Sequence, residues 1–266
     1  IWTSSYKAIQ ICNQYLAEFQ GLTFDELKLN DDYRAQMFRY TNSFKEARFL
    51  RAYFYFNLVR AYGDVPYFTE MVTTDQVNSL TRTPAQEIFN AIIAECDKLS
   101  TELPADYTKL GLDGIAPAEN GRVTCYAALA LKARAALYAA SPLFNPENNK
   151  DLWRRAAEAN KEVIETCTAN GFKLSKYSEL WGPNNWSNNE MIFVRRYNGN
   201  ISTLEEYNFP MGVPGGNSGN CPTQNMVDAY EMKATGKMWN ETGSGYDASN
   251  PYVGRDPRFD MTIVKN

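Results

Sequence analysis

The sequence predicts a mostly α-helical protein in which stacked helical hairpins support a loop-rich lobe with little strand. Three observations predict this fold class. Apolar residues recur at helical spacing through most of residues 1–170, Gly and Pro end these runs, and Gly, Asn, Pro, Ser and Trp dominate beyond Gly171. We therefore expect a helical scaffold over residues 1–170 and a lobe over residues 171–266.

The first helix is expected over residues 2–20. Its apolar residues recur at spacings of three, four and seven: Trp2, Tyr6, Ile9, Leu16 and Phe19. Gly21 is a plausible end of this helix, because Gly adopts the left-handed conformation that follows many helices. A polar stretch around residues 30–42 then leads into the second helix.

The second helix has apolar residues on every side between Phe49 and Tyr62, so it must be buried on most faces. Gly63 and Pro66 end it. Its rings are expected in the core rather than in a ligand stripe: Phe49, Tyr53, Tyr55, Phe56 and Tyr62. Arg48 and Arg51 are expected to pair with acidic side chains or helix C-termini.

Three further helices follow. Thr83-Pro84-Ala85-Gln86 fits a capping box, and one stripe of that helix is apolar: Ile88, Ile92, Cys96 and Leu99. The next is expected over residues 120–140 with Thr124 as its cap, and its many alanines allow neighbouring helices to approach closely. The last runs from about Asp151 to Thr168.

Five helices joined by short to medium loops are typical of helical hairpins of the tetratricopeptide type. The match to that repeat's consensus is confined to Ala52-x-x-x-Phe56. Beyond Gly171 the strand-like run is Glu190 to Tyr197, and residues 212–220 form a Gly/Asn/Ser-rich loop. Long loops on a rigid scaffold are where binding residues concentrate.

Composition excludes several functions. The net charge is -4 and no run of Lys or Arg occurs, so nucleic acid is not an expected partner. The chain has no His, which excludes His-based nucleophile systems and His-ligated metal sites. No stretch reaches the length of a membrane span. The five cysteines lack C-x-x-C spacing, and the first four are expected to be buried thiols.

Several separate segments resemble conserved blocks of the SusD/RagB family of nutrient-binding lipoproteins. The first is EARFLRAYFYFNLVRAYGDVP, residues 46–66. The others follow in the family's order: GRVTCYAALALKARAALYAASPLFNP, WRRAAEANKEVIETC with GFKLSKYSELW, NNEMIF, PTQNMVDAYEM and GRDPRF. Together they span nearly the whole chain.

This resemblance implies tetratricopeptide-like hairpins that support a loop-rich ligand-binding lobe, and no catalytic activity or cofactor. It also implies a lipid-anchored protein on the extracellular face of a Bacteroidetes outer membrane, which closes over a TonB-dependent, SusC-like transporter. The family's typical length exceeds 266 residues. The lipidated N-terminus and much of the C-terminal lobe are therefore expected to lie outside this sequence.

Loop aromatics beside amide side chains are the candidate ligand-binding residues: Trp186, Tyr197, Asn198, Tyr207 and Trp239. Sugar rings stack on indole and phenol faces, while amides bind sugar hydroxyls with paired donors and acceptors. The leading hypothesis is therefore an oligosaccharide or polysaccharide ligand. A peptide cargo, as in the RagB branch, and a helical-repeat protein-interaction module stay open. A glycosidase is disfavoured, because the acidic residues form no recognisable acid/base pair.

Overall fold

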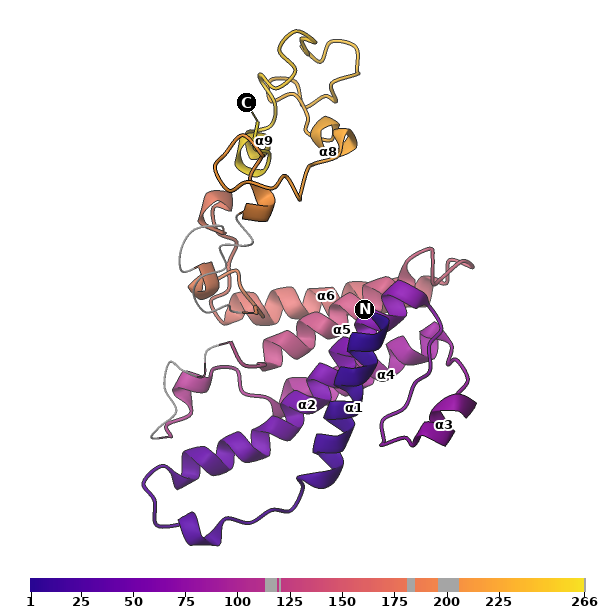
Figure 1. The fold of residues 1–266 in the computed structure, drawn as a ribbon, viewed down its shortest axis with the longest axis vertical. Helices are drawn as coiled ribbons and strands as arrows, with labels where there is room; N and C mark the ends of the chain where they lie inside the picture. Colours follow the sequence, from indigo (N-terminus) through magenta and orange to yellow (C-terminus); the bar gives the residue numbers. More distant parts are fainter. Residues whose placement is uncertain (113–118, 120, 181–184, 196–205, 266) are drawn as a thin grey trace. The chain divides into compact units, whose positions relative to one another are not determined.

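The computed structural model describes residues 1–112, 119, 121–180, 185–195 and 206–265. The chain divides into two compact units, residues 1–196 and 197–266. The first unit contains the long helices, and the second contains short helices joined by turns (Figure 1). Residues 171–195 thus belong with the first unit, while the assignment of ligand binding to residues 171–266 stays a prediction.

The first unit is a series of long helices, each packed against the next in the chain (Figure 1). They are α1 (Trp2–Glu18), α2 (Tyr33–Tyr62), α4 (Ala85–Glu102), α5 (Cys125–Ala140) and α6 (Lys150–Ala169), with a short α3 (Thr74–Ser79) beside them. Single-turn 3₁₀ helices lie between or after them: η1 (Asp25–Leu27), η2 (Tyr107–Lys109), η4 (Tyr177–Leu180) and η5 (Asn185–Ser187). This neighbour order is that of stacked hairpins, and it confirms the predicted fold class.

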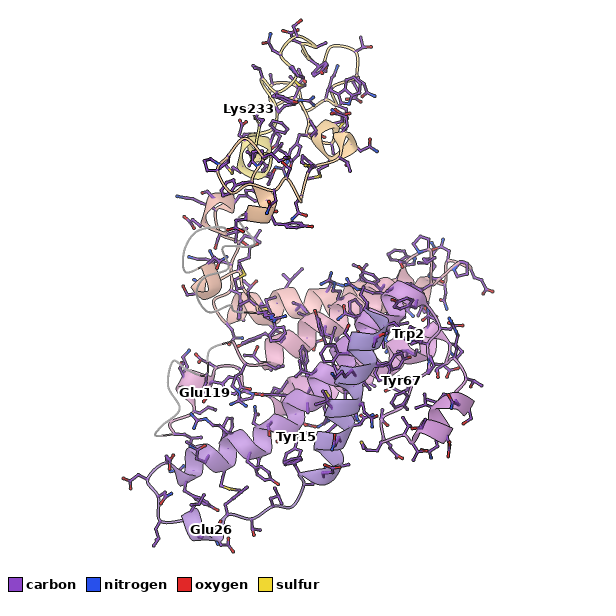
Figure 2. The ribbon with its side chains drawn as sticks, viewed as in Figure 1. Trp2, Tyr15, Glu26, Tyr67, Glu119 and Lys233 are labelled. Carbon is purple, nitrogen blue, oxygen red and sulfur yellow. The ribbon has the colours of Figure 1, made fainter. Side chains whose placement is uncertain are left out.

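The core is centred on one face of α2. Phe49, Tyr55 and Phe56 are each 1% exposed. Tyr55 packs against Tyr67, which is labelled in Figure 2, with ring centroids 4.6 Å apart. The Tyr55 hydroxyl donates to the Phe68 carbonyl at 2.6 Å. The prediction that all five rings of this segment are buried was wrong for two of them. Tyr53 and Tyr62 are 38% and 42% exposed, because the helices packed against α2 do not cover all of its surface and Tyr62 is its last residue.

Two arginines of α2, Arg48 and Arg51, have different partners. Arg48 forms ion pairs of 2.6 Å with both Glu95 and Glu102, as expected. Arg51 donates instead to the Asn13 side chain at 2.9 Å and to the Thr69 carbonyl at 2.8 Å. α2 also begins at Tyr33, so most of the stretch that reads as a polar lead-in is part of the helix.

The next two helices bury the residues that the pattern indicates. Ile88, Ile92, Cys96 and Leu99 are at most 2% exposed, which confirms the predicted stripe. Most alanines of α5 are buried: Ala127, Ala128, Ala133, Ala135, Ala136, Ala139 and Ala140. Thr124 caps α5 by accepting from the Ala127 amide at 3.4 Å, although the helix begins at Cys125 rather than near residue 120.

The five cysteines are free thiols. Cys12, Cys96 and Cys167 are buried, Cys125 is half-buried and Cys221 is exposed. Burial raises the pKa of Cys96 to about 12, so this thiol stays protonated and behaves as a core side chain.

The predicted capping box at Thr83–Gln86 was wrong. α4 begins at Ala85, and its first amide donates to Asp64 Oδ1 at 2.8 Å. Gln86 does not reach back, because its amide donates to the Ala139 and Phe144 carbonyls at 2.7 and 2.8 Å. A carboxylate from the end of the preceding long helix therefore takes the capping role.

The strand expected over residues 190–197 was also wrong for its described part. Residues 190–195 form turns and bends, and residues 196 and 197 lie outside the described ranges. The β pairing within those ranges is limited to isolated bridges: Val65 with Thr83, and Met232 with Lys237 and Arg255. Without a partner strand, the apolar run of residues 191–194 has no backbone ladder to join.

The second unit has its own small core. α8 (Gln224–Asp228) and α9 (Pro257–Thr262) are capped by Thr223 and Asp256. Phe259 is fully buried and packs against the rings of Tyr230 and Tyr252. Arg255 is 5% exposed; its guanidinium donates to the Pro251 and Tyr230 carbonyls and lies over the Tyr246 ring.

Substitution of Asp64 tests the cap between α2 and α4. We expect Asp64→Ala to lower the free energy of unfolding by about 1 kcal/mol, because the first amide of α4 loses its acceptor. Asp64→Asn keeps a side-chain oxygen at that position and should lose less than half as much. Urea denaturation followed by circular dichroism measures both; equal losses in the two variants would contradict the cap.

Candidate functional site

A cavity of about 660 Å³ lies in the first unit, between the segment that connects α4 to α5 and the segment that follows α6. Its rings and polar side chains come from both segments, which are far apart in sequence. They are Asp106, Tyr107, Lys109, Glu119, Arg122, Thr124 and Tyr126 on one side, and Asn170, Phe172, Ser187, Asn188, Asn189 and Phe193 on the other. A cavity of this size suits a ligand of a few sugar units.

The α4–α5 connection forms the first wall, and hydrogen bonds close it at its base. The Cys125 amide donates to the Pro104 carbonyl at 3.1 Å, so the two ends of the connection meet. The buried Tyr107 hydroxyl donates to the Val123 carbonyl at 2.7 Å. The backbone of this wall is therefore fixed where α4 ends and α5 begins.

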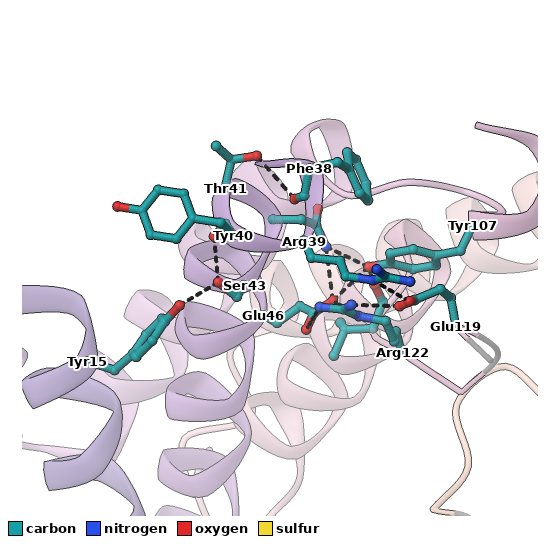
Figure 3. Close-up of polar contacts among 12 residues, drawn as sticks. Tyr15, Phe38, Arg39, Tyr40, Thr41, Ser43, Glu46, Tyr107, Glu119 and Arg122 are labelled. Carbon is teal, nitrogen blue, oxygen red and sulfur yellow. Dashed lines mark hydrogen bonds and ion pairs between the residues drawn. The ribbon is translucent and has the colours of Figure 1, made fainter. Parts of the chain in front are cut away.

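A charged network ties this wall to α2 (Figure 3). Arg122 binds Glu46 through two parallel hydrogen bonds, Nε to Oε1 at 2.8 Å and Nη2 to Oε2 at 2.9 Å. Its third donor, Nη1, reaches Glu119 Oε2 at 2.6 Å. Arg39 Nε donates to the other oxygen of Glu119 at 2.6 Å. Two carboxylates and two guanidinium groups thus neutralise one another.

The network is shielded from solvent, which strengthens its bonds. The side chain of Glu119 is 8% exposed and that of Arg122 is 23% exposed. Burial by itself would raise the pKa of Glu119, but the hydrogen bonds and charges of Arg122 and Arg39 outweigh it and hold that pKa below its ordinary value. Burial, together with the neighbouring Glu46 carboxylate, raises the pKa of Tyr107, so its hydroxyl stays protonated.

The second wall is the segment after α6, which folds back on itself. Asn188 Oδ1 accepts from the Ser175 hydroxyl at 2.6 Å and from the Glu190 amide at 2.9 Å. The Ser175 amide in turn donates to Glu190 Oε2 at 2.9 Å. Because its oxygen is engaged in this way, Asn188 presents its NH₂ group as the part of the side chain that can donate to a ligand.

Two aromatic contacts fasten this wall to the helices. Phe172 meets Tyr126 of α5 edge to face at 4.9 Å, and Phe193 meets Phe49 of α2 in the same way at 5.4 Å. Phe193 is still 42% exposed, and Phe172 is half-buried. The cavity therefore combines ring surface with amide and hydroxyl groups.

The described residues that line this cavity do not include the predicted ligand residues. Trp186 lies in η5 next to Ser187, which lines the cavity, but the placement of the Trp186 side chain is not described. Tyr197 and Asn198 lie outside the described residues. Tyr207 and Trp239 are in the second unit, 54% and 36% exposed, and no described ring contact joins them. Their binding roles stay predictions.

Tyr207 and Trp239 have well-defined surroundings. A Cβ on Gly219 would lie 2.4 Å from the Tyr207 ring, so only Gly allows the chain to pass so close to it. The Gly219 amide also donates to the Tyr207 carbonyl at 2.8 Å. Trp239 packs edge to face against Tyr246 at 5.5 Å, which accounts for part of its burial. Both rings are thus held in place by their own loops.

Phe172, Asn188 and Asn189 line the cavity but were not among the predicted ligand residues. The Asn-rich run of residues 184–189 was the available signal, and it drew attention to Trp186 rather than to the amides beside it. No signal pairs Phe172 with Tyr126, because nothing in the spacing of residues so far apart shows that they meet.

The carboxylates of the cavity do not form an acid/base pair. A general acid in glycoside hydrolysis needs a raised pKa, whereas the two described carboxylates of the lining both have a lowered pKa, Glu119 through its arginines and Asp106 through its hydrogen bonds with Thr108. In the described part of the chain, no group of three or more metal-ligating side chains is placed to hold a metal ion. The described lining residues offer hydrogen-bonding groups and ring surface.

Stacked helical hairpins with a cavity of this chemistry define a helical binding scaffold. Residues 1–137 match a family model described as starch-binding and associating with the outer membrane, and residues 148–266 match the model of the SusD family. The chain belongs to the SusD/RagB family. None of its described helices is long and apolar enough to cross a membrane.

Three relatives illustrate this similarity. A SusD-like carbohydrate-binding protein of Bacteroides fragilis superimposes with a TM-score of 0.73 at 27% identity, over 100% of this chain and 46% of that one. A laminarin-binding SusD-like protein gives 0.51 at 25% identity, over 72% and 36%. SusD-like protein P25 of Formosa agariphila is 25% identical over 83% of this chain and 42% of its own length. The chain thus spans less than half of each relative.

Substitution of Arg122 tests the contribution of the network to stability. We expect Arg122→Met to lower the free energy of unfolding by about 2 kcal/mol, because Glu46 and Glu119 lose their shared partner in a shielded site. The matched control is Arg154→Met, which breaks a pair whose side chains are 68% and 72% exposed and should cost less than about 0.5 kcal/mol. Urea denaturation measures the free energy of unfolding of both variants. Similar losses would show that the network stabilises the fold no more than an exposed ion pair does.

The lowered pKa of Glu119 predicts a pH dependence. A carboxyl whose pKa falls on folding stabilises the folded state above its unfolded pKa, near its ordinary value of 4.5, and this stabilisation disappears as the pH falls through the folded value. The stability gap between the wild type and Glu119→Gln should be full at neutral pH and shrink below about pH 4. The control is Glu165→Gln, which removes an exposed carboxylate. If the stability gap between the wild type and this variant shrinks over the same pH range, the pH dependence cannot be assigned to Glu119.

Proposed function

We propose that this chain belongs to a cell-surface glycan-binding protein, which captures oligosaccharide and delivers it to a TonB-dependent, SusC-like transporter. One observation supports the capture step above all: the cavity of about 660 Å³ combines ring surface with amide and hydroxyl groups. Sugar C–H faces pack on rings such as Phe172 and Phe193, and sugar hydroxyls exchange hydrogen bonds with Asn188 and Asn189. The carbohydrate-binding relatives support the same ligand class.

Under this proposal the protein binds its ligand without transforming it. The site would hold sugar by stacking and hydrogen bonds, and it would need no cofactor. Attachment to the extracellular face of the outer membrane through a lipid anchor is part of the proposal, and it rests on the family's association with that membrane. Among the residues predicted from sequence, Trp186 is supported by its position in η5, directly before Ser187, which lines this cavity.

Calorimetric titration with a panel of oligosaccharides tests the capture step. We expect at least one glycan to bind, and Asn189→Ala and Phe172→Ala to weaken its binding about fivefold to tenfold each, the loss of one hydrogen bond or one stacking ring. Asn90→Ala removes an exposed amide that lies on α4 and does not line the cavity, so it serves as the matched control.

Two results would contradict the proposal. One is the absence of binding to every glycan of the panel. The other is a bound glycan whose affinity drops as much in Asn90→Ala as in the two cavity variants. Binding of unstructured peptides in place of glycans would indicate the peptide-carrying alternative.

A further inference from the structure

The charges that line the cavity are already paired with one another. Among the described lining residues the cations are Arg122 and Lys109, and the carboxylates are Asp106 and Glu119. Arg122 uses Nε, Nη1 and Nη2 on Glu46 and Glu119, and Lys109 lies 3.3 Å from Asp106. Arg39, behind Glu119, takes the other oxygen of that carboxylate. Together with Glu46 and Arg39, the described charged residues of the lining therefore sum to no net charge.

From this pairing we infer that the cavity selects neutral oligosaccharides and rejects chains that carry uronic acid or sulfate groups, and that Glu119 is the residue that enforces the selection. The inference rests on the proposed function. Glu119 is 6% exposed, and both of its oxygens are bound by arginines. It thereby takes one N–H group from each arginine and neutralises positive charge that an anionic sugar would otherwise meet.

The physical reason lies in the cost of bringing a charge into the cavity. A carboxylate or sulfate group that leaves water needs a charge-assisted partner, and a guanidinium is the usual one. Here the guanidinium of Arg122 is bidentate to Glu46 and shared with Glu119, so an incoming anion would meet a guanidinium whose charge two shielded carboxylates already neutralise. A neutral sugar meets no such cost, because its hydroxyls bind the amides of the opposite wall.

Removal of the Glu119 charge should relax the selection. Glu119→Gln keeps the shape of the side chain but removes one negative charge, so Arg39 and Arg122 together gain an excess of positive charge at the cavity wall. We expect the ratio of uronate to neutral affinity to rise about tenfold. The matched control is Glu95→Gln, which removes a carboxylate that is also held by an arginine, Arg48, but does not line this cavity.

The experiment compares neutral gluco-oligosaccharides with uronic acid oligosaccharides of equal length, by calorimetry on the wild type, Glu119→Gln and Glu95→Gln. In the wild type the neutral ligands should bind at least tenfold more tightly than the uronates, and their affinity should change less than twofold between about 50 and 500 mM salt. A selectivity ratio that rises in Glu119→Gln and stays constant in Glu95→Gln supports the inference.

Several outcomes overturn it. If uronates bind the wild type as tightly as neutral ligands do, the inferred selectivity is wrong, although the proposed glycan binding is supported. An unchanged ratio in Glu119→Gln refutes the role of Glu119. Should that variant not fold, the wild-type ratio and its salt dependence decide the selection by themselves. If neither class binds the wild type, the proposed function fails and the inference fails with it.

Discussion

The bidentate bond between Arg122 and Glu46 is the interaction on which the cavity depends. Glu46 lies on α2, the longest helix, and Arg122 lies on the α4–α5 connection just before α5 begins. Arg39 also binds Glu119, and Tyr107 exchanges hydrogen bonds with Asn42 and Glu46, so several contacts hold the connection against α2. The bidentate pair is the one that joins the connection to α2 through two parallel bonds next to the start of α5.

The same bond explains why charge is tolerated in a shielded place. Isolated charges would cost several kcal/mol to remove from water, and pairing offsets that cost only when the geometry satisfies most donors and acceptors. Arg122 meets this condition through three of its nitrogens, and Glu119 through both of its oxygens. The result is a wall that is rigid, polar and neutral, which suits a ligand held by hydroxyl groups.

Local patterns were sufficient to predict most of the helical scaffold. The stripe from Ile88 to Leu99 is buried as its spacing indicates, and Thr124 caps α5 as predicted. The error at the start of α4 has a tertiary origin. Thr83 and Gln86 have the residue types of a capping box, but Asp64 reaches the first amide instead and Gln86 binds carbonyls near the end of α5 and after it.

The candidate site could be predicted only in part, because its walls meet through contacts between distant residues. Asn188 and Asn189 lie in an Asn-rich run that the sequence does mark, whereas Phe172 is brought to Tyr126 by the fold alone. Glu119 is the site residue that the sequence indicates least. It stands in a Gly/Pro-rich loop with no local feature, and its importance depends on Arg39, eighty residues earlier in the chain.

Residues 46–66 carry part of the family resemblance, and they have three structural roles. Its first residue, Glu46, holds Arg122 and with it one wall of the cavity. Its middle buries Phe49 and Phe56 in the core, and Phe49 also supports Phe193 on the other wall. Its end supplies Asp64, the cap of α4. A segment that contributes little surface of its own to the cavity therefore determines where both walls stand, because each wall rests on one of its side chains.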